Sequence, residues 1–320
     1  MTKLFIHIGP HKTGSTAIQS AIFSNRTYLR DNGIYVPEAG MTRAKDAHHN
    51  LAWQISNDQP YRADLLGWEE LIEEVEGKDV ALISSEALCS YPNAYHEKVA
   101  DLVGRGFDVE TIMVWRHQLD IINSAYTQRV KTFQLFRDFD AYWPSAIVED
   151  RYFYDRSYRK FITTSGKTSL LEFDQKNLLG NFLRRVGLSD PESLQAVTNS
   201  SANVSPLAHE VEALRMCGEL FRAWRINFAE ALQYLTGLRP GYDWTGRFYG
   251  PSEDQYREAA ALFDEVNARF IEAAHADFQP SPPKQKLRHV FDAAKLDRSE
   301  GQAFSRYLKE LTAWGTSKAR

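Results

Sequence analysis

A lysine set between two glycines follows the first apolar segment of the chain. Leu4, Phe5, Ile6 and Ile8 favour a short buried strand, and the sequence Gly-Pro-His-Lys-Thr-Gly-Ser-Thr follows over residues 9–16. Alanine and isoleucine then recur at helical spacing over residues 17–22. A strand, a glycine-bounded loop and a helix direct backbone N–H groups at an anion, and the lysine adds a positive charge. The segment therefore predicts a phosphate-binding loop.

The position of the lysine argues against an ATP-binding loop. Gly9 and Gly14 have the spacing of a Walker A motif, in which lysine directly follows the second glycine. Here Ser15 occupies that position, and Lys12 lies before the second glycine. The loop therefore favours a different phosphate-containing ligand.

A second pair of residues suited to phosphate occurs later in the chain. Arg116 ends an apolar segment, residues 109–115, that predicts a strand, and Ser124 lies on the helix predicted over 118–130. Arginine offers a planar fork of donors that matches phosphate, and serine adds a hydroxyl.

These two motifs resemble those of sulfotransferases that use 3′-phosphoadenosine 5′-phosphosulfate (PAPS), in particular bacterial carbohydrate-type members, over residues 3–187. The resemblance implies that Lys12 contacts the oxygen between sulfur and phosphorus, where its charge meets that of the leaving phosphate. It also implies a set of cofactor-binding residues. They are Pro10, His11, Lys12, Thr13, Gly14, Ser15, Thr16, Arg116 and Ser124, with Arg247 in a late basic loop. Many relatives carry Lys-Gly before that late arginine, whereas this chain has Thr245-Gly246.

Sulfuryl transfer to a hydroxyl needs a base that accepts the proton. Glu86 ends the strand predicted over 79–84, where cytosolic relatives place a catalytic histidine. His48 lies where heparan-type relatives place a glutamate, and it shares a predicted helix face with Leu51, whereas His49 points away. We favour Glu86, because the strand end fixes its position more firmly; His48, or both together, remain alternatives. No metal is predicted, because PAPS carries its own activation.

The apolar segments predict an α/β fold. Strands over 4–8, 79–84, 109–115 and 168–173 alternate with helices, which favours a P-loop-like, three-layer fold with a mostly parallel central sheet. Ligands of such sheets bind beyond the carboxyl ends of the strands, where Lys12, Glu86 and Arg116 all lie.

The remaining sequence gives two further expectations. We expect a sulfotransferase domain over residues 1–279 and a helical extension over 280–320, after the proline-rich break at 280–283. The aromatic-rich segment 133–161 fits either core packing, which we favour, or a lid whose rings stack on a sugar.

Composition narrows the function classes for this chain of 320 residues. A net charge of −4 does not support nucleic-acid binding, and two cysteines fit a reducing compartment. No apolar run approaches a membrane span or a signal peptide, so we expect a cytoplasmic protein.

We therefore predict an enzyme that moves a sulfuryl group from PAPS to a hydroxyl of a carbohydrate or small metabolite, releasing 3′-phosphoadenosine 5′-phosphate (PAP). The alternatives are a nucleotide kinase using ATP and Mg²⁺ and a non-catalytic nucleotide-binding regulator. The sequence leaves the acceptor and the oligomeric state open.

Overall fold

The chain forms two compact units. The computed structural model describes residues 1–44, 46–58, 60–194, 206–238, 242, 244–280, 282 and 287–319. The first unit consists of Met1–His117, Asp150–Thr198 and Leu262–Ser281, and the second of Gln118–Glu149, Asn199–Ala261 and Pro282–Arg320. This division differs from a boundary at residue 280, because the C-terminal segment groups with two earlier segments. Most of the proline-rich break after residue 280 lies outside the described residues.

The first unit is built on a five-stranded sheet in the order β2-β3-β1-β4-β5, with every pairing parallel. The strands are β1 (Lys3–His7), β2 (Ile34–Tyr35), β3 (Val80–Ser84), β4 (Asp108–Trp115) and β5 (Lys167–Glu172). The predicted α/β class with a parallel central sheet is confirmed. The strands form where β-branched and large apolar residues run together, as expected for a sheet covered on both faces.

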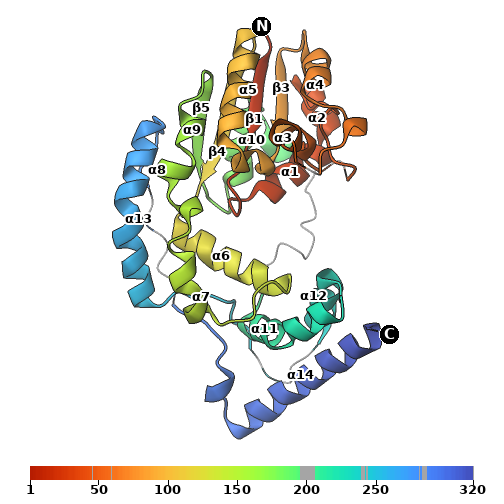
Figure 1. Ribbon diagram of the computed structural model, residues 1–320, viewed down its shortest axis with the longest axis vertical. Coiled ribbons are helices and arrows are strands. Elements are labelled where there is room, and N and C mark those ends of the chain that lie inside the picture. Colours follow the sequence, from red (N-terminus) through yellow and green to blue (C-terminus); the bar gives the residue numbers. More distant parts are fainter. Residues whose placement is uncertain are drawn as a thin grey trace. The chain divides into compact units, whose positions relative to one another are not determined.

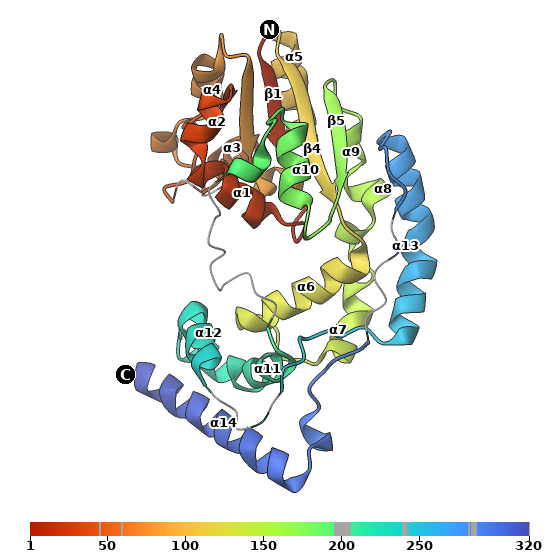
Figure 2. The same cartoon turned by 180° about the vertical axis from the view of Figure 1, so that it is seen from behind.

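Helices cover both faces of this sheet (Figures 1 and 2). They are α1 (Ser15–Ser24), α2 (Arg26–Asp31), α3 (His49–Ser56), α4 (Trp68–Val75), α5 (Pro92–Gly104), α8 (Tyr154–Ser157), α9 (Arg159–Ile162) and α10 (Leu178–Arg185). Short 3₁₀ turns are η1 (Ala63–Leu65), η2 (Glu86–Ser90), η3 (Asp150–Tyr152) and η4 (Pro191–Ser193). Helices α5 and α9 lie over one face, and α1 and α10 over the other. Phe5, Leu82 and Ile112 of the sheet pack in one buried cluster with Ile18 of α1 and Phe182 of α10, which fixes the helix that follows the glycine loop.

The second unit is helical. Its helices are α6 (Gln118–Lys131), α7 (Phe139–Ala146), α11 (Ala208–Ala223), α12 (Phe228–Gly237), η6 (Ala293–Lys295) and α14 (Arg298–Lys318), and α13 (Glu253–Ala273) begins here and continues into the first unit. The sequence favours one helix over residues 209–235, but the chain breaks it after Ala223. Arg225 adopts a left-handed backbone, with φ 55°, and the Asn227 side chain caps α12 by accepting from the N–H of Ala229 at 2.8 Å.

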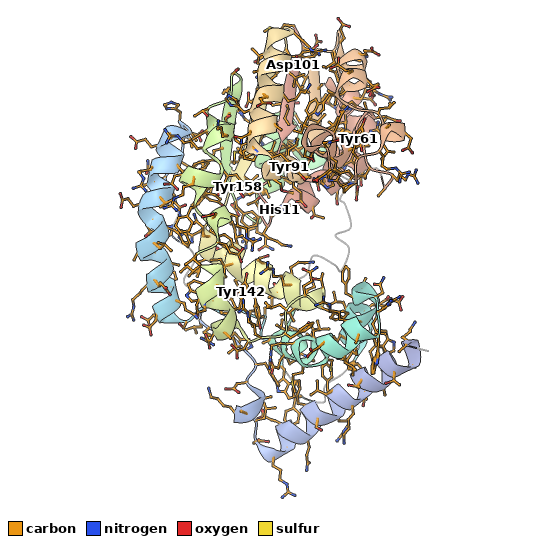
Figure 3. The ribbon with its side chains drawn as sticks, viewed as in Figure 1. His11, Tyr61, Tyr91, Asp101, Tyr142 and Tyr158 are labelled. Carbon is orange, nitrogen blue, oxygen red and sulfur yellow. The ribbon has the colours of Figure 1, made fainter. Side chains whose placement is uncertain are left out.

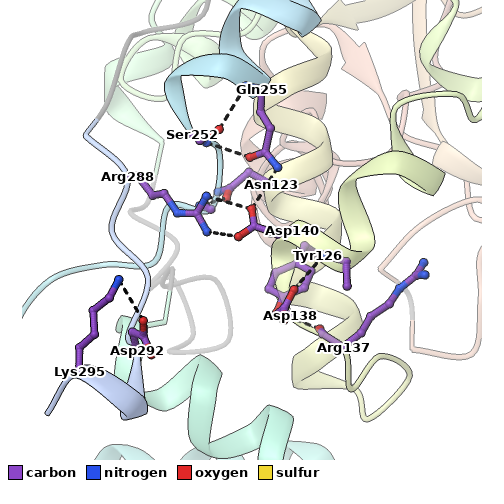
Figure 4. Close-up of polar contacts among 12 residues, drawn as sticks. Asn123, Tyr126, Arg137, Asp138, Asp140, Ser252, Gln255, Arg288, Asp292 and Lys295 are labelled. Carbon is purple, nitrogen blue, oxygen red and sulfur yellow. Dashed lines mark hydrogen bonds and ion pairs between the residues drawn. The ribbon is translucent and has the colours of Figure 1, made fainter.

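The C-terminal segment packs as part of this second unit. Phe304, Tyr307 and Leu311 of α14 are buried, and α14 contacts α11. Arg288 forms a fork with the Asp140 carboxylate, at 2.9 and 2.6 Å (Figure 4). The C-terminal segment therefore contains one helix of 21 residues and is part of the second unit.

The aromatic-rich segment is core. The rings of Phe139, Tyr142 and Trp143 in the second unit, and of Tyr154 and Phe161 in the first, are each at most 4% exposed. Rings buried in this way cannot stack on a sugar, so the lid hypothesis is wrong and the core-packing interpretation is confirmed.

A buried carboxylate ties three strands to a helix. Glu110 on β4 is 1% exposed, and its carboxylate accepts hydrogen bonds from Ser169 at 2.7 Å and from the Arg185 Nε at 2.6 Å, with Lys3 at 3.3 Å. Burial raises the pKa of this carboxyl, but Ser169 and the charge of Arg185 outweigh that effect and lower it below its ordinary value.

Glu110→Gln should destabilise the protein by about 2–3 kcal/mol, because it removes charged hydrogen bonds; Arg185 is a third exposed, so the loss stays below that of a fully buried pair. Because folding lowers the pKa of the Glu110 carboxyl, its contribution to the free energy of unfolding is fully present above the pKa that this group has in the unfolded chain. The contribution is lost as the pH falls through the pKa of the folded protein. Urea denaturation at pH 7 and below pH ~4 measures both effects. The control Asp101→Asn weakens two surface ion pairs, with Lys98 and Arg105, and should cost less than about 1 kcal/mol. Equal losses for the two variants would contradict this role for Glu110.

Candidate nucleotide site

The loop between β1 and α1 has an unusual backbone. Gly9, Lys12 and Gly14 have positive φ values of 89°, 66° and 90°. Lysine rarely adopts this conformation, and such strain is found most often at functional sites. Gly14 precedes α1, and its carbonyl accepts from the N–H groups of Ala17 and Ile18 at 3.0 and 3.2 Å. The first N–H groups of a helix have no intrahelical partner, so the start of α1 presents donors to an anion.

Two hydroxyl residues line the start of α1. Thr13 is fully buried and donates to the Pro10 carbonyl at 2.5 Å, which closes the loop on itself. Ser15 is 2% exposed, and its Oγ has no hydrogen-bond partner among the described residues. A buried hydroxyl without a partner costs free energy, so Ser15 suits a ligand oxygen at this point. Thr16, in contrast, is exposed on the first turn of α1.

Arg116, which follows β4, is fastened to the same loop. Its Nη1 donates to the Lys12 carbonyl at 2.6 Å, and its guanidinium lies 4.4 Å from the centre of the Phe173 ring, which follows β5. The backbone carbonyl of Arg116 accepts from the Tyr154 hydroxyl at 2.8 Å. The structure thus brings together the two basic residues that the sequence places at separate strand ends.

Glu86, the favoured base, lies at the same edge and pairs with a loop residue. His11 Nδ1 lies 3.6 Å from the Glu86 carboxylate, and Figure 3 shows His11 at the carboxyl-end side of the sheet, away from Asp101. Hydrogen bonds with Cys89 and with Glu86 raise the pKa of His11 to about 10. Burial raises the pKa of Glu86, but the hydrogen bond from His11 and the positive charge of that histidine lower it overall. His11 is therefore a cation in the loop, and the Glu86 carboxylate forms an ion pair with it.

His48 is buried and fully engaged by backbone groups. Its Nε2 donates to the Pro37 carbonyl at 3.0 Å, and its Nδ1 accepts from the Ser84 N–H at 3.1 Å. Burial lowers the pKa of the ring to about 4. This geometry argues against His48 as a base, because neither ring nitrogen faces a substrate. His48 directly precedes α3 rather than lying on a helix face with Leu51, and its buried ring anchors the start of that helix.

The neighbouring residue, His49, was not among the residues predicted for the site. It is the first residue of α3, half-buried, and its Nδ1 lies 2.9 Å from the Ser85 Oγ, directly after β3. The His-His pair in the sequence is the signal that marks it, because successive side chains point in different directions and meet different surroundings.

Two predicted cofactor residues belong to the second unit. Ser124 lies on α6, where its carbonyl accepts from Thr127 Oγ1 at 3.0 Å. Arg247 is exposed, and its charge acts on the Glu210 carboxyl. Their roles at a 3′-phosphate stay predictions.

A cavity of about 820 Å³ in the first unit lies elsewhere, against α2, β2 and α4. Its lining combines Arg26 and Arg30 with Glu70, Glu73 and Glu74, and contains none of the predicted site residues. The glycine loop, by contrast, combines backbone donors, an unpartnered buried hydroxyl and cations, and is the better anion site.

Comparison with protein-family models, with curated proteins and with solved structures finds no match to this chain. Among the described residues, no group of three or more histidine, cysteine, aspartate or glutamate side chains is arranged to hold a metal ion. None of the helices in the described ranges is long and apolar enough to cross a membrane.

Gly14→Ala should destabilise the protein more than Gly33→Ala does. Both glycines have positive φ, but a Cβ at Gly14 would lie 2.4 Å from Leu178 Cδ2, whereas a Cβ at Gly33 meets nothing within 4 Å. Gly33→Ala should cost about 1–2 kcal/mol for the left-handed backbone, and Gly14→Ala a further 1–3 kcal/mol, roughly, for overpacking. Denaturant titration of both variants measures the difference. Equal losses would show that the loop does not pack against α10 as described.

Proposed function

We propose that this protein is a PAPS-dependent sulfotransferase, acting on a hydroxyl of a carbohydrate or small metabolite. The observation that carries the proposal is the hydrogen bond between Arg116 and the Lys12 carbonyl. It joins the ends of β1 and β4, which are neighbours in the sheet, at the edge where parallel sheets bind nucleotides. The two free, buried cysteines suit a reducing compartment, and we place the protein in the cytoplasm.

The charges of the loop suit an anionic cofactor. Lys12, Arg116 and protonated His11 supply positive charge, and Ser15 with the start of α1 supplies neutral donors for the 5′-phosphosulfate. A guanidinium has five N–H donors. Arg116 bonds to the loop through Nη1, and we propose that the same guanidinium also contacts the 3′-phosphate of the cofactor.

The reaction is an in-line displacement at sulfur. The acceptor oxygen forms a bond to sulfur while the bond between sulfur and the bridging oxygen breaks, and negative charge gathers on the 5′-phosphate of the departing PAP. Lys12 stabilises that charge, which is greatest in the transition state. Its left-handed backbone fixes the lysine in the loop before the cofactor arrives.

PAP should bind more tightly than adenosine 2′,5′-bisphosphate, which has the same charge, and more tightly than 5′-AMP. A hydrogen bond from Arg116 to the 3′-phosphate contributes about 1.5–3 kcal/mol, so the preference should be roughly 10- to 10²-fold. Arg116→Lys keeps the charge but loses the fork and should reduce that preference, whereas Arg306→Lys on the exposed side of α14 should not. Calorimetric titration measures each affinity. Equal binding of the three nucleotides, or tight binding of ATP–Mg²⁺ alone, would refute the proposed cofactor.

Lys12→Met should lower turnover by far more than it weakens PAP binding, because the charge acts chiefly on the leaving phosphate. Release of labelled sulfate from PAPS, with water as the acceptor, measures turnover without a known substrate. We expect a loss of roughly 10²-fold or more in rate, the range found when one stabilising donor is removed. Lys309→Ala on α14 is the control and should match the wild type. A loss in rate no larger than the loss in PAP affinity would leave Lys12 as a binding contact only.

A further inference from the structure

We propose that His49 is the base that accepts the proton of the attacking hydroxyl, and that Ser85 is the positioning residue that selects which ring nitrogen accepts it. This inference rests on the proposed sulfuryl transfer and replaces both bases that the sequence suggests. His49 is the histidine at the carboxyl edge of the sheet that is half-buried and not held by backbone groups through both nitrogens.

Backbone hydrogen bonds fix His49 beside the loop. The His48 N–H donates to the Ser84 carbonyl at 2.8 Å, and the Ser84 N–H donates back to the His48 ring at 3.1 Å. The Ser85 N–H in turn donates to the carbonyl of His7, the last residue of β1, at 2.9 Å. The first turn of α3 is thus tied to the ends of β3 and of β1, the strand that leads into the glycine loop.

The contact with Ser85 determines the chemistry of the imidazole. Nδ1 lies 2.9 Å from the Ser85 Oγ, and the Trp53 ring lies 5.8 Å away, centre to centre, along α3. If Nδ1–H donates to the serine oxygen, Nε2 carries the lone pair. Among the described residues Nε2 has no hydrogen-bond partner, so it can accept a proton from a substrate hydroxyl.

Burial keeps the His49 ring neutral near pH 7. Burial lowers the pKa of the ring; the carboxylates of Glu86 on η2 and Asp46 before α3 oppose this, and His11 in the glycine loop acts with burial. The N-terminus of α3 also disfavours an imidazolium. Glu86 is the weaker base of the two, because it is paired with protonated His11 and its pKa is lowered.

Proton transfer to His49 accompanies the displacement at sulfur. The acceptor O–H bond breaks and its proton moves to Nε2 of His49, while the oxygen forms a bond to sulfur. The bond from sulfur to the bridging oxygen breaks, and its electron pair leaves with PAP. The imidazolium then returns the proton to solvent, so the products are the sulfate ester, PAP and one proton, with no other reactant needed.

The first test reads the tautomer of His49 and needs neither acceptor nor turnover. NMR of protein labelled with ¹⁵N in histidine should show His49 neutral at pH 7 with the proton on Nδ1. Ser85→Ala should shift the tautomer balance towards Nε2–H, whereas Ser90→Ala, at the end of η2, should leave it unchanged. A wild-type ring protonated on Nε2, or on both nitrogens, overturns the inference even if PAP binds as proposed.

The second test compares bases by sulfate release from labelled PAPS to water. His49→Gln should lower the rate by roughly 10²-fold, remove the fall in rate at low pH, and leave PAP affinity within about twofold; the affinity also shows that the variant is folded. Glu86→Gln should cost less than tenfold, and the control His96→Gln on α5 should match the wild type. A large loss for Glu86→Gln with a small one for His49→Gln overturns the inference. If the wild type neither binds PAP nor releases sulfate, the proposed function fails instead, while the tautomer result still stands.

Discussion

The position of β1 between β3 and β4 is the constraint on which the site depends. Parallel pairing on both sides sets His7 level with Ser84 and Ile112, and β4 continues to Trp115 alongside the glycine loop, where the Val114 N–H donates to the Gly9 carbonyl at 3.1 Å. Because the chain moves from β1 to one side and returns to the other for β4, this is the point at which an open parallel sheet offers a crevice. The glycine loop, Glu86 and Arg116 follow these three strands directly.

The buried polar groups of the first unit differ in whether they have hydrogen-bond or ion-pair partners. Glu110, at the far end of β4, is buried with three cations and a hydroxyl, which holds the sheet together. The Ser15 hydroxyl is buried and has no partner in the part of the chain that the structure describes, and Lys12 adopts a strained backbone. A fold tolerates such costs where a ligand compensates them, which is why the loop, rather than the cavity beside α2, is the better candidate site.

Three histidines of the first unit differ in charge and in hydrogen bonding because their surroundings differ. His48 is neutral, because it is buried and both nitrogens meet backbone groups. His11 is a cation, because it is half exposed and meets Cys89 and a carboxylate. His49 combines partial burial with one hydroxyl contact, which leaves a nitrogen for proton transfer. Burial alone is therefore a poor guide to a catalytic histidine, since the backbone groups around the buried His48 ring occupy both of its nitrogens.

The sequence alone determined the parallel α/β sheet, the glycine loop with Lys12, and the placing of Glu86 and Arg116 at strand ends, because apolar runs and glycine positions act locally. It also indicated that aromatic residues after Phe133 form core. Tertiary structure decided which partners the site residues have. Arg116 donates to the Lys12 carbonyl, and His11 forms an ion pair with Glu86. His48 is held by backbone groups beside the more accessible His49. Tertiary structure also decided that the C-terminal helix packs against α11. These outcomes depend on contacts between residues far apart in the chain, and no local pattern of residue types encodes which partner each polar atom meets.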